Sequence, residues 1–315
     1  MKVALIGGGA IGRKHANAIA NIEGAELVTV TGRVEPDTKE FAAEYDIPHW
    51  TLDYSESLDR PGVEAVILAT PTGMHAEQTI AAFDAGKHAL VEIPMADSLA
   101  DSEAIVAAQE RTGLVGMVAH TRRFNPSHQW VRARIAAGEY NIQHFVAQTF
   151  FFRRENKNAL GNPRSWTDHL LWHHACHTVD LFQYQTGEIA DRAWAQQGPI
   201  HPELGIAMDM TIGLGVPSGA ICTLALSFNN EGPFGSWFRY IGDTGTYVAR
   251  YDDLDTGDGE AIDVSAGHLS MDGIELQDRE FLSAIAEGRE PNSSVAQALT
   301  TMETLDRLDN VLRTT

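Results

Sequence analysis

The chain has 315 residues, 43% of them hydrophobic and 21% charged, which is typical of a soluble globular protein with one large or two ordinary domains. Acidic residues outnumber basic ones by 43 to 23, and the net charge of −20 argues against nucleic acid or an anionic membrane as a partner. No apolar run approaches the ~20 residues of a membrane-spanning helix, and the start of the chain lacks the features of a secretory signal. Cys176 and Cys222 are too few for a disulfide framework, so we expect a cytoplasmic protein.

The first 119 residues alternate between short apolar runs and helical patterns. The apolar runs predict strands at 3–6, 26–31, 65–69, 88–92 and 114–119. The helical patterns predict helices at 11–22, 37–45, 74–85 and 98–111. Strands that are apolar throughout and separated by helices indicate a parallel sheet covered on both faces. We therefore predict an α/β domain of the Rossmann type over residues 1–119.

The pattern changes after residue 120, where strands begin to follow one another directly. Helices are predicted at 127–137, 167–184, 274–287 and 295–312. Strands are predicted at 142–152, 192–197, 206–213, 219–228, 236–241 and 246–251. Consecutive strands joined by short turns indicate a largely antiparallel open sheet, so residues 120–315 are predicted to form an α+β domain for substrate and oligomer contacts. The last helix is a candidate to pack back on the first domain.

A glycine-rich loop follows the first predicted strand and opens the first predicted helix. Gly7-Gly8-Gly9-Ala10-Ile11-Gly12 fits G-x-G-x-x-G in the context that this dinucleotide fingerprint requires. Gly7 permits a tight turn, Gly9 lets backbone N–H groups reach the pyrophosphate, and Gly12 allows close packing of helix and strand. The positive end of the helix adds attraction for phosphate, so we predict a nicotinamide dinucleotide as cofactor.

The end of the second predicted strand indicates which nicotinamide cofactor is bound. An NAD site usually has an acidic residue there for the ribose 2′-hydroxyl, but this chain has Thr31 and Arg33. Arg33 can pair with a 2′-phosphate, Thr31 can donate a hydroxyl to it, and Arg13 can add a second cation. These residues predict NADP. The alternative is that Arg33 is an exposed loop residue and Glu35 binds the ribose of NAD.

A basic segment lies within the acidic chain. Residues 120–164 contain eight arginines or lysines against two acidic residues, Glu139 and Glu155. Such a segment indicates a local site for an anion, because the field of the whole molecule repels anions. Arg132 and Arg134 are expected to be solvated surface residues and not part of that site.

Three segments, Gly7–His15, Ala69–His75 and Ala85–Pro94, resemble the glucose-fructose oxidoreductase and inositol dehydrogenase family (Gfo/Idh/MocA). Arg123–Pro126 and His177–Asp180 extend the likeness over essentially the whole chain. The resemblance implies a Rossmann domain, an α+β substrate domain and an active site in the crevice between them. It also implies a homodimer or higher homo-oligomer built by stacking the open faces of the C-terminal sheets.

The resemblance also implies cofactor contacts beyond the glycine loop. Those contacts would come from Ala69, Thr70, Pro71, Thr72 and His75 along the cofactor, and from Glu92 and Pro94 beside the nicotinamide. The family usually has a lysine between the last two, and that lysine commonly serves in proton transfer. Ile93 occupies the position here and cannot accept a proton, so another residue must do so.

Histidines on the helix predicted at 167–184 are the candidates for that role. His173, His177 and Asp180 have the spacing i, i+4, i+7, which places them on one face of an α-helix. His173 or His177 can act as the general base, and Asp180, or more weakly Asp168, can orient an imidazole. The spacing of the two histidines also suits a metal, but no third ligand is evident, and we expect no metal.

With Ile93, these histidines and the arginines, the chain resembles a particular group within the family. Members of that group oxidise the cyclic hemiacetal of an anionic ring-cleavage aldehyde to a pyrone dicarboxylate during bacterial catabolism of lignin-derived aromatics. The expected substrate is thus a small polycarboxylate. Its carboxylates would be bound by guanidinium groups and its flat ring by an aromatic side chain. The candidates are Arg122, Arg123, Arg164 and Trp166. The alternatives are a sugar, polyol or dihydrodiol dehydrogenase, or an NADP-binding sensor without catalysis.

Overall fold

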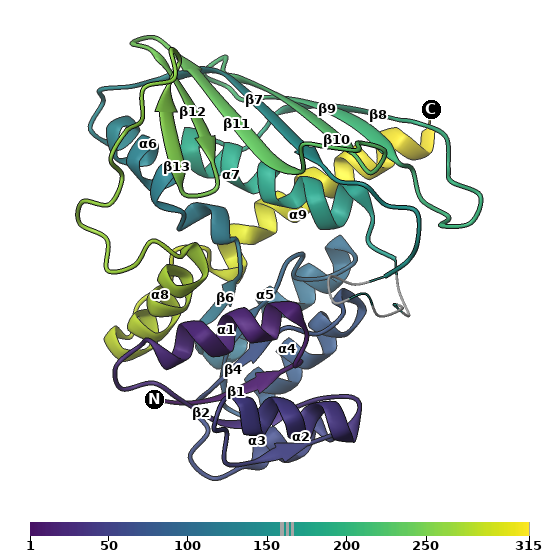
Figure 1. Cartoon of the computed structure of the whole chain (residues 1–315), viewed down its shortest axis with the longest axis vertical. Helices are drawn as coiled ribbons and strands as arrows, with labels where there is room; N and C mark the ends of the chain where they lie inside the picture. Colours follow the sequence, from purple (N-terminus) through teal and green to yellow (C-terminus); the bar gives the residue numbers. More distant parts are fainter. Residues whose placement is uncertain (158–160, 162–163, 165–166, 315) are drawn as a thin grey trace. The chain divides into compact units, whose positions relative to one another are not determined.

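The computed structural model describes residues 1–157, 161, 164 and 167–314, and the backbone forms two compact units (Figure 1). The first unit contains residues 1–120 and 274–299, and the second contains residues 121–273 and the end of the chain from Thr300. No helix of the described residues is long and apolar enough to cross a membrane.

The first unit contains a six-stranded parallel sheet with the order β3-β2-β1-β4-β5-β6. Its strands are β1 (Lys2–Ile6), β2 (Glu26–Thr31), β3 (Trp50–Thr51), β4 (Ala65–Leu68), β5 (His88–Val91) and β6 (Gly116–Val118). Its helices are α1 (Ala10–Ala20), α2 (Glu35–Glu44), α3 (Tyr54–Asp59), η1 (Thr72–Met74), α4 (His75–Asp84) and α5 (Leu99–Thr112). The strand order reverses between β1 and β4, so the carboxyl ends of these strands form the edge where a doubly wound sheet binds its ligand.

The first unit also includes helix α8 (Gly273–Glu287) from its second residue and the start of α9 (Val295–Thr314). The amide of Val118 at the end of β6 donates to the carbonyl of Ser293, and Met117 forms a β-bridge with Ser294. The compact units therefore differ from the predicted division at residue 120, because residues 274–299 group with the first unit. The hydrophobic periodicity of a helix does not reveal with which of the two units the helix packs.

The second unit contains a seven-stranded sheet with the order β13-β12-β11-β7-β10-β9-β8. Its strands are β7 (Ile142–Phe150), β8 (Arg192–Gln197), β9 (Asp209–Gly215), β10 (Ile221–Ser227), β11 (Gly235–Gly242), β12 (Thr246–Arg250) and β13 (Asp253–Thr256). The pairs are antiparallel as predicted, except that β7 and β10 are parallel. Strand β13 and the two-residue strand β3 are too short to be recognised from their patterns.

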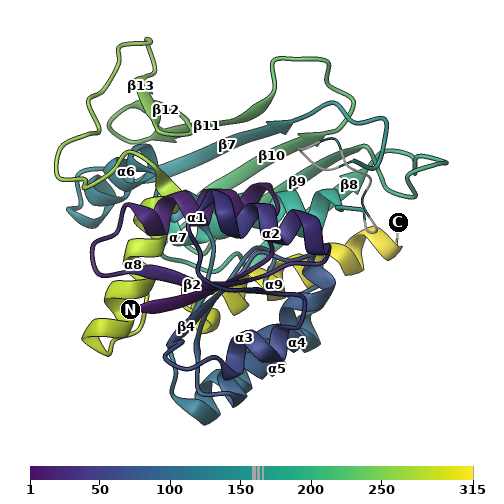
Figure 2. The ribbon, with the colours of Figure 1, turned by 60° about the horizontal axis from the view of Figure 1, so that its bottom comes forward.

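One face of this sheet is covered by helices (Figures 1 and 2). They are η2 (Thr121–Arg123), α6 (Pro126–Ala136), the π-helical turn Leu170–Ala175 (labelled η3), α7 (Cys176–Thr186) and the later part of α9. Alternate residues of β7 are buried against them, and the rings of Phe145 and Phe182 stack with centroids 6.1 Å apart. The described residues place no helix on the other face, where Val146, Trp237 and Val248 line a hollow of about 410 Å³.

Candidate active site

The glycine loop has the geometry that the sequence predicts for a pyrophosphate site. Gly7 has φ +108°, and a Cβ on it would lie 2.4 Å from the carbonyl oxygen of Ala69. A Cβ on Gly12 would lie 1.9 Å from the carbonyl oxygen of Gly7, so both positions require glycine. Gly9, by contrast, has no atom within 4 Å of its Cβ position and is the N-cap of α1, whose first turn starts at Ala10 and contains no acidic residue. The open position and the unpaired N–H groups of that turn fit a dinucleotide phosphate.

The three residues predicted to bind a 2′-phosphate have different surroundings. Thr31 is buried and its hydroxyl lies 2.7 Å from the hydroxyl of Ser57, while Arg13 contacts Glu44 and lies over the Phe41 ring. The structure thus gives Thr31 and Arg13 partners within the protein, because α2 and α3 both pack at the end of β2. Arg33 is exposed just beyond that end. Glu35, the alternative ribose ligand, accepts a hydrogen bond from Lys39 at 2.7 Å.

The remaining predicted cofactor residues follow β4 and β5 at the same edge of the sheet. Ala69, Thr70, Pro71 and Thr72 continue from β4, and Glu92 and Pro94 continue from β5. The buried His75 joins the two segments, since its ring nitrogens lie 2.8 Å from the carbonyl oxygens of Thr70 and Pro94. His75 therefore links the two segments that follow β4 and β5 at this edge of the sheet.

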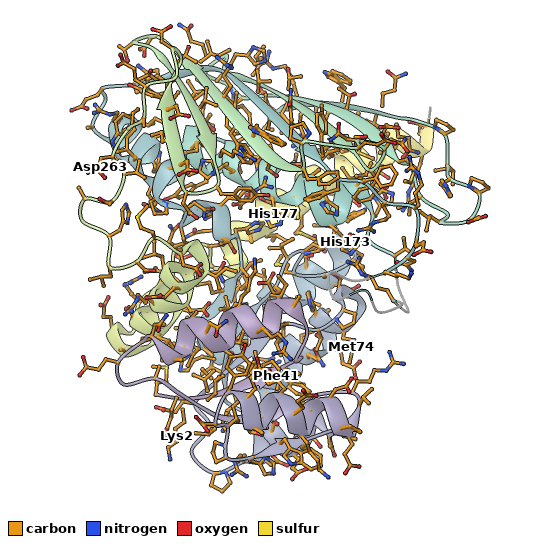
Figure 3. All side chains as sticks on the ribbon, in the orientation of Figure 1. Lys2, Phe41, Met74, His173, His177 and Asp263 are labelled. Atoms are coloured by element: carbon orange, nitrogen blue, oxygen red, sulfur yellow. The ribbon has the colours of Figure 1, made fainter. Side chains whose placement is uncertain are left out.

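The helix that carries the candidate bases is not one regular α-helix. Residues 170–175 form a π-helical turn that leads into α7, so the α-helical spacing used in the prediction does not hold across the junction. Figure 3 shows His173 and His177 on the side of this helix that points away from the seven-stranded sheet. Apolar residues on the other side, such as Val179 and Phe182, are fully buried.

Two histidines cap the start of the π-helical turn. The His169 ring accepts the Leu171 N–H at 3.1 Å, and the Nδ1 atom of His173 accepts the His169 N–H at 2.9 Å, as in a capping box. A neutral His173 whose Nδ1 accepts a hydrogen bond carries its proton on Nε2 and has no lone pair left for a substrate proton. This geometry leaves His177 as the better candidate for the base.

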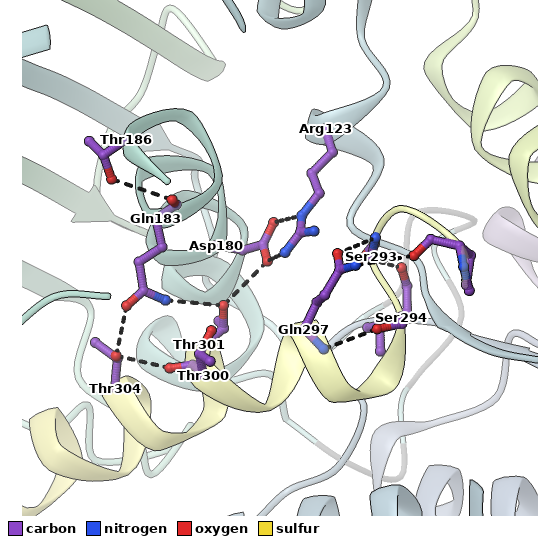
Figure 4. A network of polar contacts seen from close by, with 12 residues as sticks. Arg123, Asp180, Gln183, Thr186, Ser293, Ser294, Gln297, Thr300, Thr301 and Thr304 are labelled. Atoms are coloured by element: carbon purple, nitrogen blue, oxygen red, sulfur yellow. Dashed lines mark hydrogen bonds and ion pairs between the residues drawn. The ribbon is translucent and has the colours of Figure 1, made fainter. Parts of the chain in front are cut away.

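Asp180 forms an ion pair with Arg123, which is predicted from the sequence to bind the substrate. Its carboxylate accepts hydrogen bonds from Nε of Arg123 at 2.8 Å and from Nη2 at 2.6 Å, and both side chains are buried (Figure 4). Thr301 of α9 adds a third contact at 3.3 Å. The structure thus pairs Asp180, predicted to orient an imidazole, with Arg123, predicted to bind a substrate carboxylate, across 57 residues of chain.

Among the described residues, the partners of Arg122, the neighbour of Arg123, are uncharged. Its guanidinium donates to the hydroxyl of Thr178 at 2.8 Å and to that of Ser236 at 2.9 Å, and it lies over the ring of Phe238. No carboxylate forms an ion pair with it within the described ranges. Burial lowers the pKa of Arg122 to about 10, which is still far above neutral pH. A partly buried cation without a carboxylate partner can bind an anionic group.

A second cationic cluster surrounds Asp168. Arg153 contacts its carboxylate with both terminal nitrogens, Arg164 donates to Oδ1 at 2.6 Å, and His174 lies 3.0 Å from Oδ2. Burial and the guanidiniums of Arg153, Arg122 and Arg164 lower the pKa of His174 to about 3, so His174 is neutral and is a hydrogen-bonding residue, not a base. Arg164, predicted to bind a substrate carboxylate, is thus paired with Asp168 in the structure.

Several residues around Arg122 escaped the sequence analysis. Ser236 of β11 and Thr178 of α7 hold the guanidinium, and Thr149 of β7 lies 2.9 Å from the Ser236 hydroxyl. They are single hydroxyl residues on separate elements, so no local pattern could have identified them. Trp166, predicted to stack on the substrate ring, lies outside the described residues.

Buried neutral histidines should make the protein sensitive to acid. Burial, and then the charge of Arg122, lower the pKa of His128 to about 3, against about 6.5 in an unfolded chain. The contribution of neutral His128 to the free energy of unfolding is then fully present above pH 6.5. This contribution falls as the pH drops toward 3, by up to ~1.4 kcal/mol per pH unit. We expect H128Q to lose less unfolding free energy than the wild type between pH 7 and pH 5 in urea denaturation. Parallel losses in the two proteins would contradict this.

Comparison with known proteins agrees with the geometry of both units. The family model "Oxidoreductase family, NAD-binding Rossmann fold" matches residues 1–120, and "Bacterial oxidoreductases, C-terminal" matches residues 126–268. A 4-carboxy-2-hydroxymuconate-6-semialdehyde dehydrogenase of Sphingobium sp. is 60% identical over 309 residues, 98% of each protein. The scyllo-inositol 2-dehydrogenase (NAD(+)) of Bacillus subtilis is 30% identical over 191 residues, 59% of this chain and 54% of that protein.

Solved structures share the fold over the full chain. A levoglucosan dehydrogenase in complex with NADH and levoglucosan matches with a TM-score of 0.88 at 23% identity, covering 100% of this chain and 97% of the other. An oxidoreductase from Agrobacterium radiobacter in complex with NAD+, L-tartaric acid and magnesium matches with a TM-score of 0.85 at 19% identity, covering 99% and 96%. The chain therefore belongs to the Gfo/Idh/MocA family of oxidoreductases, with an N-terminal NAD-binding Rossmann fold.

Proposed function

We propose that this enzyme oxidises the cyclic hemiacetal of 4-carboxy-2-hydroxymuconate-6-semialdehyde to 2-pyrone-4,6-dicarboxylate with NADP+, a step in protocatechuate 4,5-cleavage. The identity of 60% to the Sphingobium dehydrogenase over 98% of both chains supports this substrate. The observation that carries the proposal within the structure is Arg122, a partly buried guanidinium whose described partners are two hydroxyls and an aromatic ring. A planar substrate carboxylate is the ligand that such a group accepts with two parallel hydrogen bonds.

Each residue of the proposed site has a separate role in the reaction. The oxidation removes a hydride from the ring carbon that carries the hydroxyl and a proton from that hydroxyl. The C–O bond between these two atoms becomes the carbonyl of the lactone. Bound NADP+ supplies the hydride acceptor. His177 takes the hydroxyl proton as general base, the role that a lysine at position 93 commonly has in the family and that Ile93 cannot perform. Arg122 holds a substrate carboxylate, and Thr178 and Ser236 fix the direction of its guanidinium.

The residues at the end of β2 support NADP as the preferred cofactor. Arg33 is exposed there, Thr31 is turned toward Ser57, and Glu35 is paired with Lys39, so the described surroundings favour a 2′-phosphate through Arg33. We expect R33D to raise the KM for NADP+ at least tenfold, since it replaces a charge-assisted contact by repulsion, and to change the KM for NAD+ far less. Steady-state kinetics with both cofactors measure the ratio. An equal change for the two would contradict the assignment to NADP.

A binding experiment tests the proposed substrate class without turnover. Isothermal calorimetry in the presence of NADP+ should show binding of 2-pyrone-4,6-dicarboxylate and no measurable binding of neutral 2-pyrone at the same concentration, because only the dicarboxylate provides a counter-ion for Arg122. Equal binding of the two pyrones, or tight binding of a neutral polyol in preference to either, would contradict an anionic substrate.

We also propose that the protein is a homodimer or higher homo-oligomer formed through the uncovered face of the seven-stranded sheet. The partly exposed side chains of Val146, Trp237 and Val248 support this, because apolar side chains on a sheet face that no described helix covers are typical of an interface. Sedimentation velocity distinguishes the oligomer from a monomer.

A further inference from the structure

The first unit contains a buried histidine that is placed between two carboxylates. His15 of α1 is 0% exposed. Its Nδ1 atom lies 2.8 Å from Oδ2 and 3.0 Å from Oδ1 of Asp278 in α8, and its Nε2 atom lies 3.1 Å from Oε1 of Glu92 at the end of β5. His15 is 77 residues from Glu92 and 263 residues from Asp278 in the chain, and neither His15 nor Asp278 has a role in the reaction proposed above.

The two contacts determine the charge of the ring. A neutral imidazole has one N–H donor and one lone pair, and the lone pair would repel the second carboxylate, so both contacts are favourable only for an imidazolium. Burial alone lowers the pKa of His15, but the charges and hydrogen bonds of Asp278 and Glu92 outweigh it and raise the pKa to about 10. His15 is therefore charged at neutral pH and fastens both carboxylates.

Glu92 lies at the edge of the sheet that binds the cofactor. Its N–H donates to the carbonyl of Leu68 in β4, and its side chain is 16% exposed. In a doubly wound sheet the dinucleotide crosses the reversal of strand order, so that the adenosine half lies on the β1–β2 side and the nicotinamide half on the β4–β5 side. The carboxylate of Glu92, which follows β5, is thus on the nicotinamide side of the sheet, whereas Arg33 follows β2 on the adenosine side.

Helix α8 is fixed to α1 by a second polar contact that does not involve Glu92. Asn21, at the end of α1, donates to Glu275 at 3.2 Å, and Arg279 donates to the carbonyl of Asn21 at 2.8 Å. The contact between His15 and Asp278 is therefore not the sole attachment of α8. The buried carboxylate of Asp278 keeps the His15 ring charged and oriented toward Glu92.

We propose that His15 is a positioning residue for the nicotinamide half of the cofactor: held by Asp278, its imidazolium directs the Glu92 carboxylate toward the carboxamide N–H groups of a bound nicotinamide. The inference rests on the proposed use of a nicotinamide dinucleotide and adds which buried residues orient its reactive end. Glu92 would make the contact, and His15 and Asp278 would act through it.

The test compares ligands with and without the nicotinamide. NADPH and 2′-phospho-ADP-ribose, together with NADH and ADP-ribose, are titrated by calorimetry into the wild type, H15Q, E92Q and D278N. We expect H15Q and E92Q each to weaken binding of the reduced dinucleotides about tenfold, the loss of one charge-assisted hydrogen bond, and to leave the truncated ligands within about twofold. The double variant H15Q/E92Q should be no weaker than either single variant, because the two residues act as one unit.

Controls separate this role from general damage. E275Q disturbs the other contact between α1 and α8 and should leave all four affinities unchanged. Thermal melting checks that each variant is folded, and D278N supplies the same test if H15Q does not fold. Equal weakening of full and truncated ligands, or unchanged affinity for the reduced dinucleotides in a folded H15Q or D278N, would overturn the proposal. Failure of the wild type to bind any of the four would instead contradict the proposed cofactor.

Discussion

R122M is expected to raise the KM for the semialdehyde roughly 100-fold and to increase the free energy of unfolding at the same time. The loss of affinity follows from removing one partner of a charge pair that forms only when substrate is bound. The gain in stability, about 1 kcal/mol, follows because folding of the variant no longer desolvates a cation that has no carboxylate partner among the described residues. Steady-state kinetics and urea denaturation of the same preparation measure both effects.

R132M is the matched control for this substitution. Arg132 is an arginine of the same unit that donates to the carbonyl of Gln185 at 3.2 Å and lies over the Tyr184 ring, so its loss should leave the KM within about twofold. A fall in stability of R122M with an unchanged KM would show that Arg122 is a structural residue, and would remove the main structural support for an anionic substrate.

H177A is expected to lower kcat by about 10² to 10⁴, the range for loss of a general base, with a small change in the KM for NADP+. H173A should behave differently. Because Nδ1 of His173 accepts the His169 N–H at the start of the π-helical turn, its removal should cost about 1 kcal/mol of stability, as for other helix caps, and change kcat less than tenfold.

The pH dependence distinguishes the two histidines further. If His177 is the base, the acid limb of the kcat profile should disappear in H177A and persist in H173A, and added imidazole should restore part of the activity of H177A alone. A loss of kcat in H173A as large as in H177A, without a loss of stability, would contradict the assignment of the base.

The sequence predicted the Rossmann unit well because its signals are local. Apolar runs separated by helices identified β1, β2, β4, β5 and β6 to within a few residues, and the glycine spacing located the turn where Gly7 and Gly12 leave no room for a Cβ. Strand β3 has only two residues and carries no such pattern. The parallel pairing of β7 with β10 was also missed, because those strands are distant in the chain.

The candidate site was harder to predict because its contacts join distant residues. A common face of His173, His177 and Asp180 requires the rotation of about 100° per residue of an α-helix, whereas the π-helical turn before α7 has a different rotation per residue. The buried pair of Arg123 and Asp180 joins two residues that each had a plausible functional role when considered alone. Of the arginines assigned to the substrate, Arg122 alone has no carboxylate partner in the part of the chain that the structure describes, and only the fold reveals this.

The central claim is that this protein converts a hemiacetal semialdehyde into a pyrone dicarboxylate. The most direct measurement is incubation with NADP+ and 4-carboxy-2-hydroxymuconate-6-semialdehyde, following NADPH by absorbance and 2-pyrone-4,6-dicarboxylate by chromatography. We predict one molecule of pyrone for each NADPH, with slower turnover when NAD+ replaces NADP+. Reduction of NADP+ by neutral sugars or polyols but not by the semialdehyde, or tight NADP+ binding with no reduction by either, would contradict the proposed function.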